Sequence, residues 1–542
     1  MSESEPVVLD GASLTPEDVA AVARDGRPVA ISDSAREAVR ESRERVEEVL
    51  DGDEAVYGLN TGFGQLVTER IPARDRERLQ TNLVRSHASG VGRELEREEV
   101  RAMMLTRINA LVKGYSGIRE VVVDHLVTML NREVHPVVKS RGSLGASGDL
   151  APLAHQALVL LGEGEARVSP RDTERSSGRS PRDEDGERLD GEAALAKAGL
   201  EPLSLAAKEG LALINGTQLS VGLGALCVVD AERALRGADI AGALTTEVLM
   251  GTTAACDPAI QDVRPHSGQA TSARNVRNLT AGSEIVESHR NCDRVQDAYS
   301  IRCLPQVHGA ARDAVSHLRE AVEIELNSAT DNPLIFAGDS VDDRASGTEN
   351  VGVLSGGNFH GAPLALRLDY ATNALADLAA IAERRVDRLL NPNLQEDHLP
   401  PFLTPDSGVC SGYMIAQYSA AALVNENRSL GAPSIDNTPV SGGQEDHVSM
   451  SAQSALNART AVENALTVVG IELLCGAQAM EFVDDGLAPG SGTGVAYDTI
   501  RDVIPPLDDD RPLHAEIEIA AELIATGTLE ARVERGANEP IV

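Results

Sequence analysis

Apolar side chains recur at intervals of three and four residues over six long stretches of the chain, a spacing typical of helices with a buried face. These stretches are residues 98–113, 118–131, 217–250, 308–328, 363–390 and 446–482. Several are rich in alanine and exceed the length of an ordinary helix. The pattern predicts an all-α fold, an elongated bundle of long helices with a smaller mixed N-terminal domain.

Turn signals and charge divide the rest of the chain. Over residues 1–110 short apolar runs alternate with glycine-rich turns such as Tyr57-Gly-Leu-Asn-Thr-Gly-Phe-Gly64, which indicates an N-terminal domain. We expect the central long-helix bundle over 111–482 and a C-terminal helical region over 483–542. Residues 166–192 hold too few apolar side chains to build a core, so they predict an acidic surface loop.

The charge of the chain is strongly negative. It has 84 acidic and 49 basic side chains, a formal net charge of −35, and only four of the basic residues are lysines. Such a chain repels nucleic acid and anionic membranes, and high salt would screen its repulsion of itself. The balance indicates a salt-rich cytoplasm, as in extreme halophiles, and a merely acidic protein from a GC-rich genome is the alternative.

Cysteine and histidine spacings indicate no disulfide scaffold and no metal site. The chain contains no Cys-x-x-Cys pair and no His-Glu-x-x-His sequence. The first residues lack a basic region followed by an apolar stretch, and no uninterrupted apolar run reaches membrane-spanning length. We therefore expect a cytoplasmic protein with reduced thiols. Its six cysteines are Cys227, Cys256, Cys292, Cys303, Cys410 and Cys475.

The candidate chemistry lies in Gly142-Ser-Leu-Gly-Ala-Ser-Gly-Asp-Leu-Ala-Pro-Leu-Ala-His155. Glycines at such positions destabilise a chain unless the backbone needs the room. The segment lacks the Gly-x-Ser-x-Gly of a hydrolase and the Gly-Lys-Ser/Thr of a phosphate loop. A helix-entry loop and an anion-binding nest are compatible with these residues.

Condensation of the backbone is a further possibility. If the chain bends sharply, the amide nitrogen of Gly148 can attack the carbonyl carbon of Ala146 and close a five-membered ring. Loss of one water at that carbon and of a second from the Ser147 side chain leaves a methylidene group conjugated to the ring. The product is a strong electrophile, which no common side chain supplies.

The run Gly145-Ala-Ser-Gly-Asp-Leu-Ala-Pro152 resembles the signature of the aromatic amino acid ammonia-lyases, which depend on 4-methylidene-imidazol-5-one (MIO). The resemblance extends from Tyr57–Gly64 to Ser441-Gly-Gly-Gln-Glu-Asp-His-Val-Ser-Met450. It is strongest to members that eliminate ammonia from L-histidine to give trans-urocanate, the first step of histidine degradation. It implies an MIO formed from Ala146, Ser147 and Gly148, no metal or dissociable cofactor, and a fumarase/aspartase-like helical architecture.

The resemblance also implies catalytic roles for two tyrosines. A base must lie near the β-carbon of the substrate, and Tyr57 is the candidate. A tyrosine has an ordinary pKa of about 10, so it needs positive charge or hydrogen-bond donors nearby to act as a phenolate. Tyr299 is implied to assist the chemistry near the prosthetic group. Whether the amine or the imidazole of the substrate attacks the MIO stays open.

Substrate-binding residues follow from the same resemblance. Gln296, Tyr299 and Arg302 are spaced by three, which would place them on one side of a helical turn, and the apolar residues around them argue against a solvated face. Arg302 offers a planar fork for the substrate carboxylate, and Gln296 a polar contact. Asn215 is implied to hydrogen-bond near the ring oxygen or the substrate amine, and Phe359 to line the pocket.

Two positions indicate the choice of substrate. His87, in Ser86-His87, corresponds to the selectivity position of the family members that act on histidine. Glu445 lies in the second of two Gln-Glu-Asp-His sequences, and its carboxylate can accept from an imidazole N–H. Facing a phenyl ring, such a buried carboxylate would be costly. The first copy, Gln395–His398, is interpreted as a loop without this role.

Other functions are compatible with parts of this pattern. An MIO-dependent tyrosine or phenylalanine ammonia-lyase, or a 2,3-aminomutase, would carry the same signature. The fumarase and argininosuccinase lyases are disfavoured because their Gly-Ser-Ser-x-Met-Pro-x-Lys loop is absent, and a binding scaffold would have little reason to keep the whole polar set. By resemblance we expect a homotetramer of dihedral symmetry with active sites shared between subunits, and no nucleic-acid or membrane partner.

Overall fold

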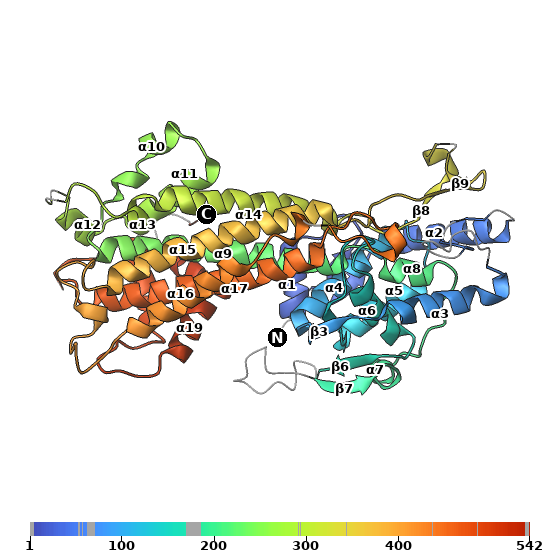
Figure 1. Cartoon of the computed structure of the whole chain (residues 1–542), viewed down its shortest axis with the longest axis horizontal. Helices are drawn as coiled ribbons and strands as arrows, with labels where there is room; N and C mark the ends of the chain where they lie inside the picture. The colour runs from blue at the N-terminus through green and yellow to red at the C-terminus, as the bar shows by residue number, and fades with distance from the viewer. Residues whose placement is uncertain are drawn as a thin grey trace. The chain divides into compact units, whose positions relative to one another are not determined.

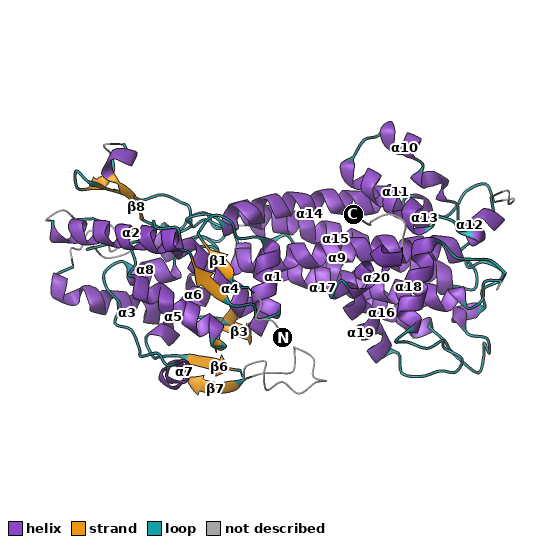
Figure 2. Cartoon of the chain, turned by 180° about the vertical axis from the view of Figure 1, so that it is seen from behind, coloured by secondary structure: helices purple, strands orange, loops and turns teal. Residues whose placement is uncertain are grey.

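A computed structural model of the protein is mainly helical, as predicted (Figures 1 and 2). The structure describes residues 5–52, 55–56, 58–61, 71–169, 186–290, 292, 294–342, 344–435, 437–484, 486–536 and 541. The chain forms two compact units, each assembled from three separate stretches. Unit 1 comprises Met1–Leu226, Arg319–Asp369 and Ala432–Leu456, and unit 2 comprises Cys227–Leu318, Tyr370–Gly431 and Asn457–Val542.

All six helices predicted from apolar spacing are present. They are α4 (Arg97–Val112), α5 (Glu120–Asn131), α9 (Gln218–Val248), α14 (Leu304–Leu326), α15 (Ala362–Leu390) and α17 (Ser451–Met480). The chain passes between units within α9, α14, α15 and α17, so each unit combines segments distant in sequence. The division into 1–110, 111–482 and 483–542 follows the order of the chain and stays a prediction.

Among its described residues, unit 1 combines further helices with four small sheets. The helices are α1 (Pro16–Arg24), α2 (Asp33–Asp51), α3 (Arg76–His87), α6 (Leu150–Leu160), α7 (Gly191–Ala198) and α8 (Glu209–Ile214). Strands β1 (Val7–Leu9) and β2 (Val29–Ile31) pair in parallel. The other sheets are antiparallel, and the smallest of them pairs β3 (Val91–Glu94) with β5 (Lys139–Arg141). In the two three-stranded sheets the middle strands are β6 (Glu165–Val168), between β4 (Val134–Pro136) and β7 (Glu187–Asp190), and β10 (Val351–Leu354), between β8 (Leu334–Ala337) and β9 (Ser346–Gly347).

Helix α2 was not predicted, although its sequence carries a helical signal. The Ser32 side chain caps it by accepting from the Ala35 amide. Buried residues then recur on one face, and Val46 and Val49 pack against Ile335 of strand β8 in a shared apolar cluster. Charged residues fill most of the other positions of the helix, which obscures its narrow apolar face in the sequence.

The prediction of an acidic loop over 166–192 was wrong at both ends of that range. Most of β6 and the whole of β7 lie within that range and pair antiparallel, for example Ala166 with Leu189. Backbone pairing and the burial of Ala166 stabilise the ribbon despite its charged side chains. Residues 170–185 of the predicted loop lie outside the described residues.

Unit 2 is a helical bundle around segments of the long helices. Its further helices are α10 (Pro258–Asp262), α11 (Ser267–Leu279), α12 (Glu284–Ser288), α13 (Tyr299–Arg302), α16 (Met414–Ser429), α18 (Ser491–Arg501), α19 (His514–Ala525) and α20 (Thr528–Gly536). Where α15 meets α17, the Arg385 guanidinium donates to both oxygens of Glu472, at 2.5 and 2.8 Å. Both side chains are fully buried, so removal of either partner would leave a buried side chain without its ion-pair partner.

Of the helices that the structure describes, α17 is long and apolar enough to cross a membrane by length and composition. However, 83% of its most apolar window is buried inside the protein. This burial is typical of a helix in a protein core.

Candidate active site

A cavity of about 880 Å³ in unit 1 brings together most of the predicted site residues. They reach it from α3, from the loop after β5, from the turn after α8, and from the segments around residues 359 and 445. The predicted residues that line it are His87, Ala146, Ser147, Gly148, Asn215, Phe359 and Glu445.

The Ala146-Ser147-Gly148 triplet lies against the turn that follows α8. Gly148 has a φ of +76°, and a Cβ built there would lie 2.2 Å from the carbonyl oxygen of Gly216. The Asp149 amide donates to that oxygen at 2.7 Å, and Asn215 Nδ2 donates to the Ser147 carbonyl oxygen at 2.7 Å. This close approach of two backbones explains why position 148 requires glycine.

The chain before the triplet is held from another side. The amide of Gly361 and the Ser449 hydroxyl both donate to the Gly145 carbonyl oxygen at 3.0 Å. Met450 N donates to the Leu144 carbonyl oxygen at 2.7 Å. Segments distant in sequence therefore fix both ends of the bend.

Asp149, directly after the triplet, is fully buried among neutral donors. Its carboxylate accepts from the Ser143 hydroxyl at 2.7 Å and from the Ser220 amide and hydroxyl at 2.9 and 3.1 Å. Burial raises its pKa above the ordinary value of an aspartate, and these hydrogen bonds oppose the shift. Asp149 ties the start of α6 to the start of α9.

Polar atoms that line the cavity have unused hydrogen-bonding capacity. Glu445 Oε2 and Asn215 Oδ1 are buried with no partner among the described residues. His87 Nδ1 lies 2.8 Å from the Leu83 carbonyl oxygen, which can only accept, so in the neutral ring the Nδ1 carries the proton. Nε2 of His87 is then an acceptor. The described lining contains no lysine or arginine.

Three predicted residues lie in unit 2 and do not line this cavity. Tyr299 and Arg302 share the short helix α13, with the Arg302 guanidinium carbon 4.8 Å from the centre of the Tyr299 ring. The prediction that Gln296 shares their helical turn was wrong, because α13 begins at Tyr299 after an extended Ala298. Tyr299 is 69% exposed and Gln296 is exposed, which also contradicts the expectation of a covered segment.

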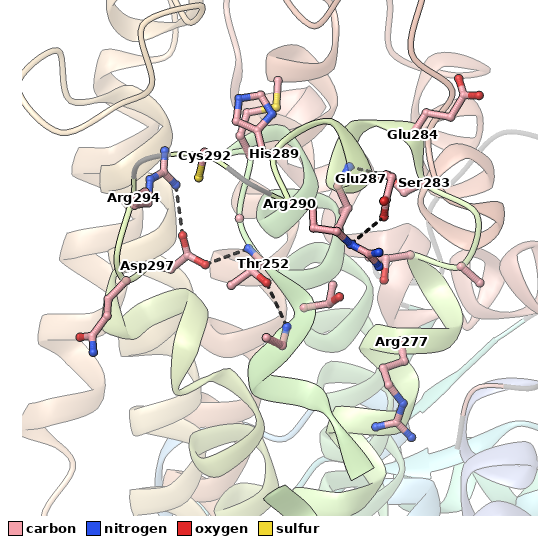
Figure 3. A pocket seen from close by; sticks show the side chains of 18 of the residues that line it. Thr252, Arg277, Ser283, Glu284, Glu287, His289, Arg290, Cys292, Arg294 and Asp297 are labelled. Carbon is pink, nitrogen blue, oxygen red and sulfur yellow. Dashed lines mark hydrogen bonds and ion pairs between the residues drawn. The ribbon is translucent and has the colours of Figure 1, made fainter. Parts of the chain in front are cut away.

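The segment that carries these residues borders a second cavity, of about 800 Å³, within unit 2 (Figure 3). The Asp297 carboxylate accepts from the Thr252 amide at 2.8 Å and from Arg294 at 3.1 Å. Arg294 also pairs with Glu396 of the first Gln-Glu-Asp-His sequence, which lies in a loop as predicted. The exposed segment is thus held by its neighbours.

Tyr57 and Phe63 lie outside the described residues. Gly58, which follows Tyr57, packs closely against other parts of unit 1. A Cβ built there would lie 2.6 Å from Pro333 and 3.2 Å from Leu211, a residue that lines the cavity.

Sequence reasoning missed several polar residues at or behind the cavity. Asn332 and Ser355 line it and hydrogen-bond to each other at 3.0 Å. Arg107 lies behind the Asn215 turn, fully buried within α4. The signal for Arg107 was an arginine inside an otherwise apolar helical run.

Among the described residues, no group of three or more His, Cys, Asp or Glu side chains could hold a metal ion.

Comparisons with known proteins agree with this geometry. A family model for the aromatic amino acid lyases matches residues 14–502. A probable histidine ammonia-lyase of Halobacterium salinarum is 64% identical over 538 residues, 99% of each chain. The histidine ammonia-lyase of Gloeobacter violaceus is 51% identical over 97% of each chain.

Solved structures give the same result at lower identity. The crystal structure of histidine ammonia-lyase from Trypanosoma cruzi superimposes with a TM-score of 0.87 at 38% identity, covering 99% of this chain and 96% of that one. Tyrosine aminomutase from Streptomyces globisporus gives a TM-score of 0.88 at 36% identity, covering 99% and 100%. The overall fold alone therefore does not separate these two chemistries.

The Gly148→Ala substitution tests the close approach to Gly216. We expect it to lower the free energy of unfolding by about 3 kcal/mol or more, because an unfavourable φ and a clash with backbone add together. Gly199→Ala is the matched control, since Gly199 has nearly the same φ, +75°, and a Cβ built there would meet nothing within 4 Å. Gly199→Ala should lower the free energy of unfolding by only about 1 kcal/mol. Equal losses in denaturant unfolding would contradict the packing described here.

Proposed function

The chain belongs to the aromatic amino acid lyase family, and we propose that it is a histidine ammonia-lyase that converts L-histidine to trans-urocanate and ammonia. One observation carries the choice of substrate. The buried, unpartnered carboxylate oxygen of Glu445 lines the same cavity as the triplet and His87. An imidazole N–H satisfies that oxygen, whereas the phenyl ring of phenylalanine has no donor to offer it.

The residues around the triplet suit the MIO on which the family depends. Ring closure needs the Gly148 nitrogen to approach the Ala146 carbonyl carbon, and the positive φ of Gly148 bends the chain at that point. Ala146, Ser147 and Gly148 would form the group, and Asn215 Nδ2, 2.7 Å from the Ser147 carbonyl oxygen, would hydrogen-bond to it. An MIO supplies an electrophile that accepts electrons from the substrate and so activates ammonia for departure.

The remaining roles belong to side chains of this chain. We assign Glu445 to hold the imidazole and His87 to accept a further hydrogen bond through Nε2. The free Asn215 Oδ1 would accept from the substrate ammonium group. Phe359 contributes an apolar wall. By family resemblance, Tyr57 is assigned as the base at the β-carbon, and Tyr299 as a residue that assists the chemistry near the prosthetic group.

The substrate carboxylate requires a cation that the cavity of unit 1 lacks among its described residues. We propose that Arg302 of another subunit provides it, together with Gln296 and Tyr299, in a homotetramer with shared active sites. The exposure of Tyr299 in this chain supports the idea, because a residue held on the surface by buried neighbours is available to a second copy. Shared sites would couple assembly to catalysis.

We also propose a cytoplasmic location in a salt-rich cell. The spacing of the six cysteines, with no Cys-x-x-Cys pair in the sequence, supports a reducing compartment. The net charge of −35 would be screened by high salt, which shortens the reach of repulsion between exposed carboxylates.

Ser147→Ala tests the assignment of the prosthetic group. We expect the native chain to be lighter than its sequence by two water molecules, and the variant to have neither that deficit nor lyase activity. The measurements are intact mass and the ultraviolet absorbance of urocanate, with Ser340→Ala, an exposed serine, as the control. A full mass deficit in active Ser147→Ala protein would overturn the assignment, and preferential turnover of tyrosine or phenylalanine by the native enzyme would overturn the substrate.

Glu445→Gln tests the imidazole contact. We expect kcat/KM for L-histidine to fall by about 10- to 100-fold, the effect of losing a hydrogen bond to a charged partner. The loss for L-phenylalanine should be smaller, because its ring makes no such bond. Glu518→Gln, on the exposed face of α19, is the control. An unchanged ratio of the two substrates would show that Glu445 does not select the ring.

Mixed oligomers test the shared sites. Ser147→Ala and Arg302→Ala should each be almost inactive alone, but a co-expressed mixture should regain activity, because a site can take its triplet from one chain and its arginine from another. Native mass spectrometry would verify that mixed oligomers form. Mixed tetramers that stay inactive would contradict the proposal.

A further inference from the structure

Arg107 is a cation at the centre of unit 1 that the proposed chemistry does not yet use. It lies in α4, is fully buried, and its Nη1 donates to the Asn215 carbonyl oxygen and to Gln218 Oε1, both at 2.7 Å. Gln218 in turn donates to the Thr330 hydroxyl at 2.7 Å. Arg107 therefore supports the 215–218 turn from the side of the protein core.

The 215–218 turn is tightly packed between Arg107 on one side and the triplet on the other. Gly216 has a φ of +139°, and a Cβ built on it would lie 2.5 Å from Gln218 Oε1 and 2.9 Å from Arg107 Nη1. On its other side the turn contacts the Ser147 carbonyl oxygen through Asn215 and the Asp149 amide through Gly216. Movement of the arginine would shift both contacts.

The charge of Arg107 is poorly balanced by its surroundings. Its Nε and Nη2 atoms have no hydrogen-bond partner among the described residues. Burial lowers its pKa to about 10, which leaves the guanidinium protonated at neutral pH. Asp331 attracts it but is hydrogen-bonded to the buried Lys208 Nζ at 2.7 Å.

The carboxylates near the turn are held by neutral groups. Glu325 accepts from the Thr217 hydroxyl at 2.6 Å, and Asp149 accepts from serines. Burial raises the pKa of both above the ordinary value of a carboxyl group. The hydrogen bonds of the Arg107 guanidinium go to neutral oxygens, those of Asn215 and Gln218. Arg107 therefore places a positive charge directly behind the Asn215 turn, with no carboxylate hydrogen-bonded to it among the described residues.

We propose that Arg107 is a positioning residue for the condensation of Ala146-Ser147-Gly148: it fixes the Asn215 turn and supplies positive potential that favours negative charge on the Ser147 carbonyl oxygen. The inference rests on the proposed function, since it concerns how that site matures. It adds a residue that touches neither the triplet nor the substrate.

The need for this potential follows from the bonds that change. A bond forms between Gly148 N and the Ala146 carbonyl carbon, and the Ala146 oxygen leaves as water with the amide hydrogens of Ser147 and Gly148. A second water takes the Ser147 hydroxyl and the proton on Ser147 Cα. When that proton leaves, its electron pair spreads onto the Ser147 carbonyl oxygen, to which Asn215 Nδ2 donates. Fixed donors and charge near such an oxygen lower the barrier.

The test measures maturation directly and does not rely on lyase activity. Freshly synthesised chains would be followed by intact mass over time, with circular dichroism and thermal unfolding to verify folding. Arg107→Gln removes the charge, Arg107→Lys keeps it, and Gln218→Glu neutralises the cation while preserving a side chain of the same shape. The control is Arg101→Gln, because Arg101 is also buried in α4 but donates to Glu133 and the Leu130 carbonyl oxygen.

We expect Arg107→Gln and Gln218→Glu to lose their two waters about tenfold more slowly than the native chain, a smaller effect than removal of a direct donor. Folded chains with one or both waters still present should accumulate. Arg107→Lys should mature nearly normally, and Arg101→Gln should be less stable but mature at the native rate.

Several outcomes would overturn the inference. These are native maturation rates in folded Arg107→Gln and Gln218→Glu, equal slowing in Arg101→Gln, or failure of all three Arg107 and Gln218 variants to fold, which would make Arg107 purely structural. A native chain without the mass deficit would instead overturn the proposed function itself, so the two failures are distinguishable.

Discussion

Two stretches of backbone meet at Gly148 and Gly216 with no room for a side chain between them, and the proposed chemistry depends on that contact. A helix that ends at Ile214 presents Asn215 and Gly216 to the triplet, and Asp149 ties the triplet to the start of α9. The bend is thus imposed by tertiary structure rather than by the local sequence. Glycine permits this conformation, and hydrogen bonds from several sides hold it.

Buried polar atoms without hydrogen-bond partners connect this packing to the proposed function. Most buried polar atoms in a folded protein have partners, and leaving one without costs free energy. In unit 1 the exceptions include Glu445 Oε2 and Asn215 Oδ1 at the cavity and two nitrogens of Arg107 behind it. In our proposal the substrate provides hydrogen-bond partners for Glu445 Oε2 and Asn215 Oδ1. The two Arg107 nitrogens stay without partners, and the positive charge of the guanidinium acts on the triplet. Substrate binding would then recover the stability lost at Glu445 and Asn215.

The sequence predicted the long helices and much of the cavity, for different reasons. Helices such as α9 and α15 follow from apolar spacing, and the grouping of His87, Asn215, Phe359 and Glu445 with the triplet was expected from the family resemblance. Tertiary facts were not accessible from the sequence. The helical placement of Gln296 failed because α13 begins only at Tyr299, and the Asp297 carboxylate before it is held by the amide of Thr252, which is 45 residues away in sequence.

The role of Arg107 could not be predicted from the sequence either. A charged residue in an apolar helix was visible, but its role depends on α8 and α9 meeting beside it, which no local pattern encodes. The two units are a further case, because four of the helices that the spacing predicted, α9, α14, α15 and α17, each contribute residues to both units.

An electron-density map of the native, active enzyme at high resolution tests the central claim most directly. The account predicts continuous density between Gly148 N and the Ala146 carbonyl carbon, a trigonal carbon in place of the Ser147 hydroxymethyl group, and Asn215 Nδ2 within hydrogen-bond distance of the Ser147 oxygen. An open peptide through these three residues in fully active enzyme would contradict it.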